Sequence, residues 1–217
     1  MSERDDILAS PISHTKDQVR GAVRELRKEM GEGNRAAASQ TICESVLEMG
    51  AIERAETVFV YVGYGNEVQT LSLIEKLLEM GKRVCVPKLG NAKGIVKPGA
   101  PMKVVELQGM DVLKESDQGI LEPRKGKQYP GSPDVTITPC VAATSFGARL
   151  GQGGGYYDKY FASIPLTVRV ALAFECQILE DLPGGDRDCV VDLVVTEKSI
   201  YQRDEVAIDE DDLWEET

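Results

Sequence analysis

The chain is poor in the residues on which many catalytic sites depend. Histidine occurs once, as His14 in a polar stretch near the N-terminus. A Ser-His-Asp or Cys-His hydrolase would depend on this one side chain, which argues against that class of chemistry. The five cysteines lie far apart and form no C-x-x-C pair. This spacing predicts reduced, mostly buried thiols of a cytosolic protein, and argues against a disulfide framework or a zinc site.

Long hydrophobic runs are also missing. No segment approaches the roughly 20 apolar residues of a membrane span, and residues 1–6 lead into polar sequence without the apolar run of a signal peptide. The 36 acidic residues outnumber the 25 basic ones, which gives a formal net charge of -11. Such a chain repels nucleic acid and anionic membranes. We therefore expect a cytoplasmic protein that acts on small molecules, with neither nucleic acid nor membrane as a partner.

The 217 residues predict one domain, because domains run at roughly 100–200 residues. We expect a flexible N-terminus over residues 1–14, one domain over 15–203 and an acidic tail over 204–217. The run of acidic side chains predicts a solvated tail. Trp214 is the residue there that could dock on the domain or on a partner.

Apolar periodicity divides the domain into alternating helices and strands. Thr15 and Gln18 form a capping box that predicts a helix ending at Gly31. Further helices are expected over 34–49, 70–80 and 156–163. Strands are expected over 57–62, 83–87, 103–107, 135–142, 168–174 and 190–196. This order predicts a single three-layer α/β/α domain around a mixed, largely parallel sheet.

The densest functional signal is the glycine loop, Arg149-Leu150-Gly151-Gln152-Gly153-Gly154-Gly155-Tyr156-Tyr157-Asp158. It follows an expected strand and opens an expected helix, whose first N–H groups can bind an anion. Glycine lets the backbone approach a phosphate closely, Arg149 adds a charged fork, and Asp158 suits Mg²⁺. The loop is not a P-loop, because its glycines are followed by Tyr156 and Tyr157 and not by Lys-Ser/Thr. It is not a dinucleotide fingerprint either, because Tyr156 stands where the fingerprint requires glycine. Four glycines in five positions still favour a phosphate site over a plain turn.

Charged residues elsewhere point to the same side of the sheet. Lys16 and Arg20 lie four residues apart on the first helix, with Arg27 on the same stripe beside the apolar face. Glu67 follows the first expected strand, and open α/β sheets bind ligands at the carboxyl ends of their strands. We expect these residues and the glycine loop to share one crevice. The plain alternatives are that the three basic residues form a solvated face of the helix and that Glu67 is an ordinary acid in a loop.

Taken in this order, the motifs resemble the 5-formyltetrahydrofolate cyclo-ligase family, also called 5,10-methenyltetrahydrofolate synthetases. The resemblance runs from Lys16 to about Thr196. It rests on Lys16-x-x-x-Arg20, Glu67-Val68-Gln69-Thr70, Gly119-Ile120-Leu121-Glu122-Pro123, the glycine loop and Asp188-x-x-x-Asp192. It implies a fold like that of NagB, RpiA and the CoA transferases. It also implies ATP- and Mg²⁺-dependent conversion of 5-formyltetrahydrofolate to 5,10-methenyltetrahydrofolate, with release of ADP and phosphate.

The resemblance also implies the roles of individual residues. ATP would be bound by Lys16, Arg20, Arg149, Leu150, Gly151, Gln152, Gly153, Gly154, Gly155, Tyr156 and Tyr157. Catalysis would involve Arg149, Lys16 and Tyr156, and the folate site would be lined by Val62, Glu67 and residues 152–156. Asp158 and Asp188 would hold Mg²⁺. Asp188 could instead cap the turn into the last strand, and it would reach the crevice if that strand runs antiparallel.

Three questions stay open at this stage. Some relatives carry an aromatic residue around Gln118, so stacking on the pterin would come here from Tyr64, Tyr129 or Tyr156. The chain could be a folate-binding paralogue that sequesters 5-formyltetrahydrofolate without turnover, or a nucleotide- or sugar-phosphate enzyme on a related fold. We expect a monomer and leave a dimer open.

Overall fold

The structure is a computed structural model that describes residues 2–88, 102–115, 121–123, 126–164 and 166–203. The acidic tail with Trp214 lies outside the described residues. The same holds for Gln118 and for the first two residues of the Gly119–Pro123 motif.

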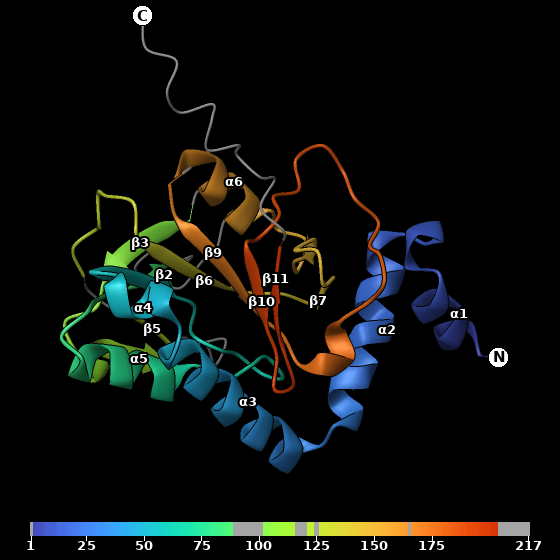
Figure 1. The fold of residues 1–217 in the computed structure, drawn as a ribbon, viewed down its shortest axis with the longest axis horizontal. Coiled ribbons are helices and arrows are strands. Elements are labelled where there is room, and N and C mark those ends of the chain that lie inside the picture. Colours follow the sequence, from blue (N-terminus) through green and yellow to red (C-terminus); the bar gives the residue numbers. More distant parts are fainter. Residues whose placement is uncertain (1, 89–101, 116–120, 124–125, 165, 204–217) are drawn as a thin grey trace, which may run out of the picture.

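A seven-stranded sheet, in the order β11-β10-β9-β6-β1-β2-β3, forms the centre of the fold (Figure 1). Its five inner strands run parallel: β1 (Thr57–Val60), β2 (Arg83–Lys88), β6 (Val135–Pro139), β9 (Val168–Leu172) and β10 (Leu193–Val195). Its two edge strands pair antiparallel: β3 (Lys103–Glu106) and β11 (Ile200–Gln202). All four residues of β1 are buried, as expected for a parallel strand covered on both faces. The predicted mixed, largely parallel sheet is confirmed.

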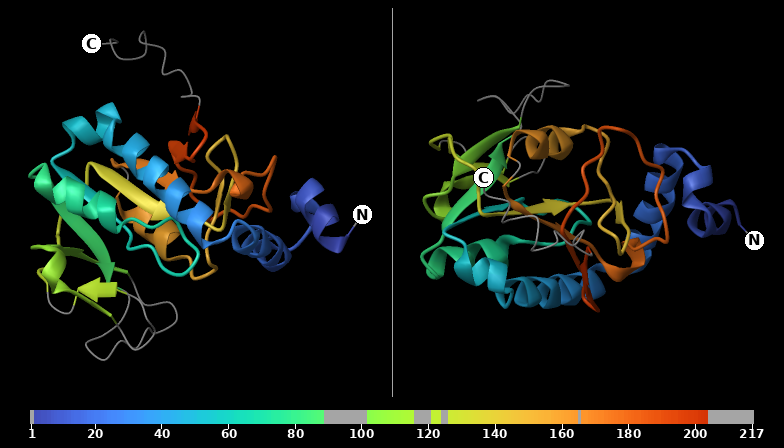
Figure 2. Two further views of the ribbon diagram at one scale, coloured as in Figure 1. Left: turned by 90° about the horizontal axis from the view of Figure 1, so that it is seen from below. Right: turned by 45° about the horizontal axis from the view of Figure 1, so that its top comes forward.

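Helices cover both faces of this sheet (Figures 1 and 2). One face carries α3 (Glu32–Leu47), α4 (Gly50–Arg54) and α5 (Leu71–Glu79), and the other carries α6 (Tyr156–Ser163). The side chains of β1 alternate between the two layers. Val58 and Val60 join the core beneath α3 and α5, whereas Phe59 meets Tyr157 and Tyr160 of α6. The predicted three-layer α/β/α arrangement is therefore confirmed.

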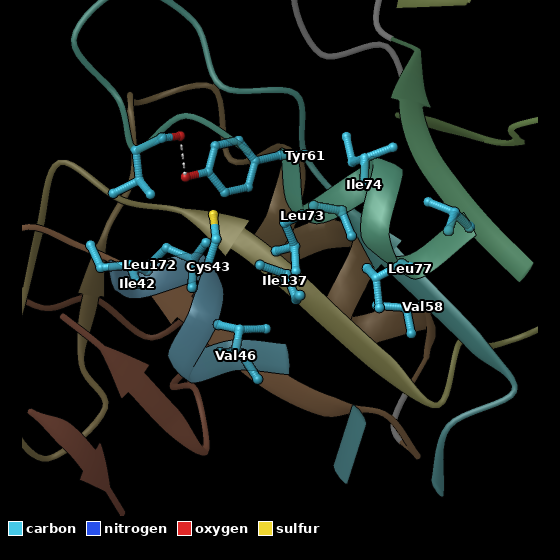
Figure 3. Close-up of a cluster of buried hydrophobic side chains, with 14 of the residues drawn as sticks. Ile42, Cys43, Val46, Val58, Tyr61, Leu73, Ile74, Leu77, Ile137 and Leu172 are labelled. Atoms are coloured by element: carbon cyan, nitrogen blue, oxygen red, sulfur yellow. Dashed lines mark hydrogen bonds between the residues drawn. The ribbon is translucent and has the colours of Figure 1, made fainter. Parts of the chain in front are cut away.

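The larger core lies between the sheet and the pair of helices α3 and α5 (Figure 3). Ile42 and Val46 of α3 and Leu73 of α5 are fully buried there, together with Ile137 of β6. Burying one such aliphatic side chain contributes roughly 1.5–3 kcal/mol. This packing fixes the carboxyl ends of β1 and β6, where the functional residues begin.

The N-terminal segment, for which the sequence predicts flexibility, contains regular secondary structure in its described part. Residues 1–14 contain α1 (Glu3–Ala9) and a short 3₁₀ turn over Pro11–Ser13. Ser2 and Asp5 form a capping box at the start of α1, and Ile7 is buried against α2 (Lys16–Glu29). Ile7 and Leu8 are adjacent in an otherwise polar stretch and give no helical periodicity, so the sequence pattern missed this helix. The capping box of Thr15 and Gln18 that begins α2 is confirmed.

Short elements connect the sheet to its surroundings. Two small antiparallel pairs accompany it: β4 (Leu113–Glu115) with β5 (Leu121–Pro123), and β7 (Ala142–Ala143) with β8 (Arg149–Leu150). Two 3₁₀ turns complete the described elements: Met110–Val112 and Glu175–Gln177. The expected strand over 135–142 thus ends at Pro139, and the β7–β8 hairpin leads from there to the glycine loop.

All five cysteines are free thiols, as predicted. Burial raises the pKa of Cys43 to about 11 and the pKa values of Cys85 and Cys140 to about 12. These groups therefore stay protonated and act as small core residues. Within the described ranges, no helix has the length and apolarity needed to cross a bilayer.

Candidate active site

A cavity of about 510 Å³ opens at the carboxyl ends of the central parallel strands. Its wall contains every residue that the resemblance assigns to ATP, folate or Mg²⁺: Lys16, Arg20, Val62, Glu67, all of residues 149–158, and Asp188. Arg27, which was expected in the same crevice, does not line it. The start of α2 and the glycine loop therefore face the same space, as predicted. A ligand in this cavity can therefore contact both segments.

The glycine loop joins β8 to α6 and depends on glycine conformations. Gly153 has φ +104° and Gly155 has φ +62°, values that other residues rarely adopt. A Cβ on Gly153 would lie 3.4 Å from Cζ of Arg20. No side chain caps the N-terminus of α6, where Gly155 is the N-cap. The loop thus brings uncapped helix N–H groups and a guanidinium to one wall of the cavity.

Arg20 fixes the glycine loop to α2. Its Nε donates a hydrogen bond to the carbonyl oxygen of Gly151 at 2.8 Å, and its Nη1 donates to Asp17 at 2.5 Å. The guanidinium of Arg20 is therefore oriented by the loop before any anion arrives. An oriented arginine loses less conformational freedom on binding a phosphate than a mobile one.

Arg149 lies deeper than the forked phosphate ligand that the sequence suggested. Its side chain is 1% exposed, and its Nη2 donates to Oδ1 of Asp158 at 2.7 Å. Its Nη1 donates to the carbonyl oxygen of Pro139 at 3.4 Å, and the Tyr157 and Phe161 rings lie beneath the guanidinium. Arg149 therefore ties the end of β6 to the first turn of α6. Its Nε has no hydrogen-bond partner among the described residues.

Asp188 reaches the cavity by a route that differs from the expected one. The last core strand, β10, runs parallel to β9, so the condition of an antiparallel strand is not met. A parallel pair needs a connection that returns along the sheet, and residues 173–192 provide it. On this return Asp188 accepts a hydrogen bond from Lys16 at 2.5 Å. The backbone N–H of Cys189 donates to Oδ1 of Asp158 at 3.3 Å, which brings both predicted magnesium ligands to one region.

The loop that carries Glu67 is held by hydrogen bonds to the end of β1. The Tyr61 hydroxyl donates to the carbonyl oxygen of Val68 at 3.0 Å (Figure 3). The Thr70 hydroxyl donates to the carbonyl oxygen of Tyr61 at 2.6 Å and accepts from the backbone N–H of Gly63 at 3.0 Å. Because the loop folds back on its own strand, Glu67 has a fixed position in the cavity wall.

Glu67 is partly buried and receives two hydrogen bonds. Nε2 of Gln152 donates to Oε1 at 3.1 Å, and the backbone N–H of Tyr64 donates to Oε2 at 3.2 Å. Gln152 in turn accepts a hydrogen bond from Nη2 of Arg24 at 2.6 Å. Burial raises the pKa of Glu67, and the bonds from Gln152 and Tyr64 oppose this rise. The carboxyl group is thus poised to accept hydrogen bonds from a ligand when ionised.

The three tyrosines considered for stacking separate into two groups. Tyr64 and Tyr156 line the cavity. Tyr129 does not line it, because its hydroxyl contacts Thr57 at the opposite end of β1 and its ring lies under Arg83. Tyr129 is therefore removed from the candidates.

Several cavity residues received no role from the sequence: Tyr61, Pro87, Leu121, Glu122, Pro139 and Cys140. Tyr61, Pro87 and Pro139 lie at strand ends, so the carboxyl-end rule would have found them once the strand boundaries were known. Leu121 and Glu122 belong to a quoted motif. From α2, Arg24 donates a hydrogen bond to Gln152, and Arg27 opposes the burial-induced rise in the pKa of Glu67. No local pattern indicates either interaction.

The carboxylates in the cavity fit a magnesium ion that is partly coordinated by substrate. No cluster of three or more His, Cys, Asp or Glu suited to a metal occurs in the described part of the chain. Mg²⁺ in nucleotide sites is bound by one or two carboxylates together with water and phosphate oxygens. Asp158 and Asp188 supply two carboxylates in one wall, next to the loop suited to phosphate.

Comparisons with known proteins agree with this arrangement. A probable 5-formyltetrahydrofolate cyclo-ligase of Caenorhabditis elegans is 29% identical over 87% of this chain and 95% of its own length. The 5-formyltetrahydrofolate cyclo-ligase of Escherichia coli K12 is 29% identical over 83% of this chain and 99% of its own. The solution structure of 5,10-methenyltetrahydrofolate synthetase from Aquifex aeolicus superposes with a TM-score of 0.75 and 26% identity, covering 88% of this chain and 93% of that one.

A structure from Mycoplasma pneumoniae, described as a 5,10-methenyltetrahydrofolate synthetase, has a TM-score of 0.66 at 18% identity and supports the fold alone. The sequence model of the family itself matches residues 12–197. This match spans the helix, the strands and the loops that build the cavity. The chain belongs to the 5-formyltetrahydrofolate cyclo-ligase family.

Proposed function

We propose that this protein is an ATP-dependent ligase that converts 5-formyltetrahydrofolate to 5,10-methenyltetrahydrofolate and releases ADP and phosphate. The observation that carries the proposal is that one cavity contains both a wall suited to phosphate and a partly buried acid. Lys16, Arg20 and the glycine loop form the wall suited to phosphate, and the acid is Glu67. A protein that only binds folate would not need the wall suited to phosphate.

The ATP phosphates are assigned to Lys16, Arg20 and residues 149–157. Arg20 already points its guanidinium at the loop, and the uncapped N-terminus of α6 adds N–H donors. Tyr157 packs its ring against Phe59 beneath the loop, which holds the backbone in place. Arg149 lies beneath the same wall, and its Nε has no hydrogen-bond partner among the described residues, so it can interact with charge that develops on the phosphate.

Asp158 and Asp188 are assigned to Mg²⁺. The ion would supply positive charge to the phosphate oxygens as the γ-phosphoryl group moves. Arg149 pairs with Asp158, and Lys16 pairs with Asp188. The second pair is about one-third exposed on each side chain, so Lys16 can exchange Asp188 for a phosphate oxygen when nucleotide and metal enter together.

The folate is assigned to Val62, Glu67 and residues 152–156. The Glu67 carboxylate would accept hydrogen bonds from N–H groups of the pterin. Tyr64 and Tyr156 offer rings for stacking on that heterocycle, because both line the same cavity. This placement puts the formyl group between the acid and the glycine loop, within reach of the triphosphate.

The reaction then needs alignment more than covalent work by the protein. The formyl oxygen attacks the γ-phosphorus and ADP leaves, which gives an iminium phosphate. The folate N10 attacks the formyl carbon and loses its proton, the C–O bond breaks, and phosphate departs with the former formyl oxygen. Lys16, Arg20 and Arg149 spread the charge on the moving phosphoryl group, and Tyr156 orients the two substrates. The absence of a triad or a reactive thiolate is consistent with this chemistry.

An absorbance assay tests the proposal. The protein is mixed with 5-formyltetrahydrofolate, ATP and Mg²⁺, and the near-ultraviolet band of the methenyl product is followed over time. Growth of the band only when all three are present is the expected result. Folate binding without product would favour a sequestering paralogue, and neither binding nor product would favour a different phosphate enzyme. A cytoplasmic location and a monomeric state remain predictions from the sequence.

A further inference from the structure

Arg27 on α2 is a buried cation, and two of its three guanidinium nitrogens have no hydrogen-bond partner among the described residues. The residue is 5% exposed, and its Nε and Nη1 have no partner among the described residues. No ion pair within 4.0 Å joins it to an acid in the described ranges. A buried charge left in this way costs several kcal/mol, so its presence in a folded protein calls for a compensating role.

The position of Arg27 on the helix makes the charge more unusual. Val19, Val23 and Arg27 follow one another at intervals of four residues, and all three are buried. This spacing marks the core-facing stripe of α2, where an apolar residue would be the ordinary choice. Packing alone therefore does not explain an arginine here, and the plain alternative of a solvated basic face is wrong for this residue.

Hydrogen bonds connect α2 to Glu67 close to Arg27, because Arg24, one turn earlier on the helix, donates to Gln152 and Gln152 donates to Glu67. The groups whose charges act on Arg27 belong mostly to the cavity wall. Burial lowers the pKa of Arg27, and Glu67 is the strongest opposing influence, followed by Cys140 and Tyr61. Cys140 and Tyr61 themselves have raised pKa values because of burial, and they stay neutral. Among the described residues, Glu67 is thus the carboxylate with the largest influence on this guanidinium. The relation is mutual, since Arg27 opposes the burial-induced rise in the pKa of Glu67.

A ligand that covers Glu67 would remove more water from the carboxylate. Desolvation favours the protonated acid, which would lose part of its capacity to accept N–H hydrogen bonds. Gln152 and the backbone of Tyr64 donate to the two oxygens but bring no charge. Arg27 lies outside the cavity wall, and its Nε and Nη1 have no partner among the described residues, so it can supply the missing charge without occupying the ligand's place.

We propose that Arg27 is a positioning residue that keeps Glu67 ionised from behind the cavity wall, so that the carboxylate can accept hydrogen bonds from the N–H donors of the bound pterin. The proposal rests on the folate assignment above. Arg27 does not line the cavity, so it acts through Glu67 and makes no contact with the substrate. The buried charge at position 27 is then offset when the folate completes the site.

A double-mutant cycle tests the coupling. Arg27→Met, Glu67→Gln and the double variant are compared with the wild type for binding of 5-formyltetrahydrofolate and of ATP by calorimetry. Arg27→Met fills a similar volume, and replacing a buried ion by an apolar side chain is often neutral for stability. We expect Arg27→Met to weaken folate binding about tenfold, to leave ATP binding unchanged, and to have little further effect once Glu67 is already glutamine.

Two further variants separate charge from packing. Arg27→Lys retains the positive charge and should recover most of the folate affinity. Arg35→Met is the matched control, because Nη1 of Arg35 donates to the carbonyl oxygen of Arg27 at 3.1 Å without touching its guanidinium. We expect Arg35→Met to leave folate affinity unchanged. A thermal melt of each variant confirms that it is folded.

The pH profile of folate binding provides a second readout. The titratable and charged groups that act on Arg27 or Glu67 are Arg24, Tyr61, Cys140, Tyr157 and Cys176, and the phenols and thiols among them have raised pKa values. These groups do not change charge between weakly acidic and neutral pH. The loss of affinity on acidification should therefore follow Glu67, and it should begin at a higher pH in Arg27→Met than in the wild type.

The outcomes separate this inference from the proposed function. A wild type that binds no 5-formyltetrahydrofolate contradicts the proposed function itself. A wild type that binds it, with an Arg27→Met variant that binds it equally well, overturns only the role of Arg27. Additive losses in the cycle, an equal loss of ATP affinity, or no recovery in Arg27→Lys would assign Arg27 to packing and would also overturn the inference.

Discussion

Nζ of Lys16 donates to Oδ2 of Asp188 at 2.5 Å, although the two residues lie 172 positions apart in the chain. The contact joins the first turn of α2 to the return segment before β10 across the mouth of the cavity. It pairs a residue assigned to ATP with a residue assigned to Mg²⁺. The pair therefore holds these two assigned groups next to each other in the cavity wall.

Replacement of Lys16 by alanine should weaken ATP binding in the presence of Mg²⁺ by roughly 1.5–3 kcal/mol, the usual value of a charge-assisted hydrogen bond. Calorimetric titration of the nucleotide measures the change. Lys28→Ala is the control on the same helix, because Lys28 forms an exposed pair with Glu25 and such pairs contribute roughly 0–1 kcal/mol. Equal nucleotide affinities in the wild type and in Lys16→Ala would contradict the phosphate assignment.

Replacement of Gly153 by alanine should impair both the loop and the nucleotide site. The residue has φ +104°, and the new Cβ would approach the guanidinium of Arg20. We expect a loss of roughly 1–3 kcal/mol in the free energy of unfolding from backbone strain, together with weaker ATP binding. Gly184→Ala is the control, since Gly184 has open space around it and no positive φ. Equal denaturation midpoints for the two variants would show that glycine at position 153 is not required for stability.

Replacement of Asp158 by asparagine should raise the Mg²⁺ concentration needed for half-maximal product formation by about tenfold or more. Asparagine keeps an oxygen that can accept the hydrogen bond from Arg149, so the domain should stay folded. Asp186→Asn, in the same loop as Asp188 but exposed and away from the cavity wall, should titrate like the wild type. An unchanged metal titration in Asp158→Asn would remove this residue from the metal site.

Replacement of Glu67 by glutamine should have opposite effects on stability and on binding. Burial raises the pKa of Glu67 above its unfolded value, so the folded protein binds the proton more tightly. The free energy of unfolding therefore decreases as the pH rises from the unfolded pKa through the folded pKa. Glutamine removes this dependence, so Glu67→Gln should melt at a higher temperature than the wild type at neutral pH and should bind folate more weakly. Melting curves across pH measure the first effect, with the exposed Glu79→Gln as control.

Local patterns predicted most of the elements because they depend on residues close together in sequence. The capping box of Thr15 and Gln18 begins α2 as expected, and the predicted helix over 156–163 coincides with α6. The strand–helix–strand units appear as β1-α5-β2 and β6-α6-β9, each with parallel pairing. The carboxyl-end rule then placed Glu67 and the glycine loop in one cavity without any distance information.

The features that the sequence did not predict depend on contacts between distant segments. The direction of β10 is set by its pairing with β9, and no local pattern specifies that choice. The burial of Arg27 depends on segments that fold over α2. The pairing of Arg149 with Asp158 was hidden because both residues suit a phosphate-and-metal site equally well.

The hydrogen bonds of Gln152 have a thermodynamic consequence. This side chain belongs to the loop assigned to ATP, yet it bridges Arg24 on α2 and the acid assigned to folate. Any shift of the loop when one substrate binds must alter the free energy of the other half of the cavity. Such linkage is reciprocal, so the factor by which nucleotide changes the affinity for folate must equal the factor by which folate changes the affinity for nucleotide. A single amide thereby makes the two co-substrates effectors of one another.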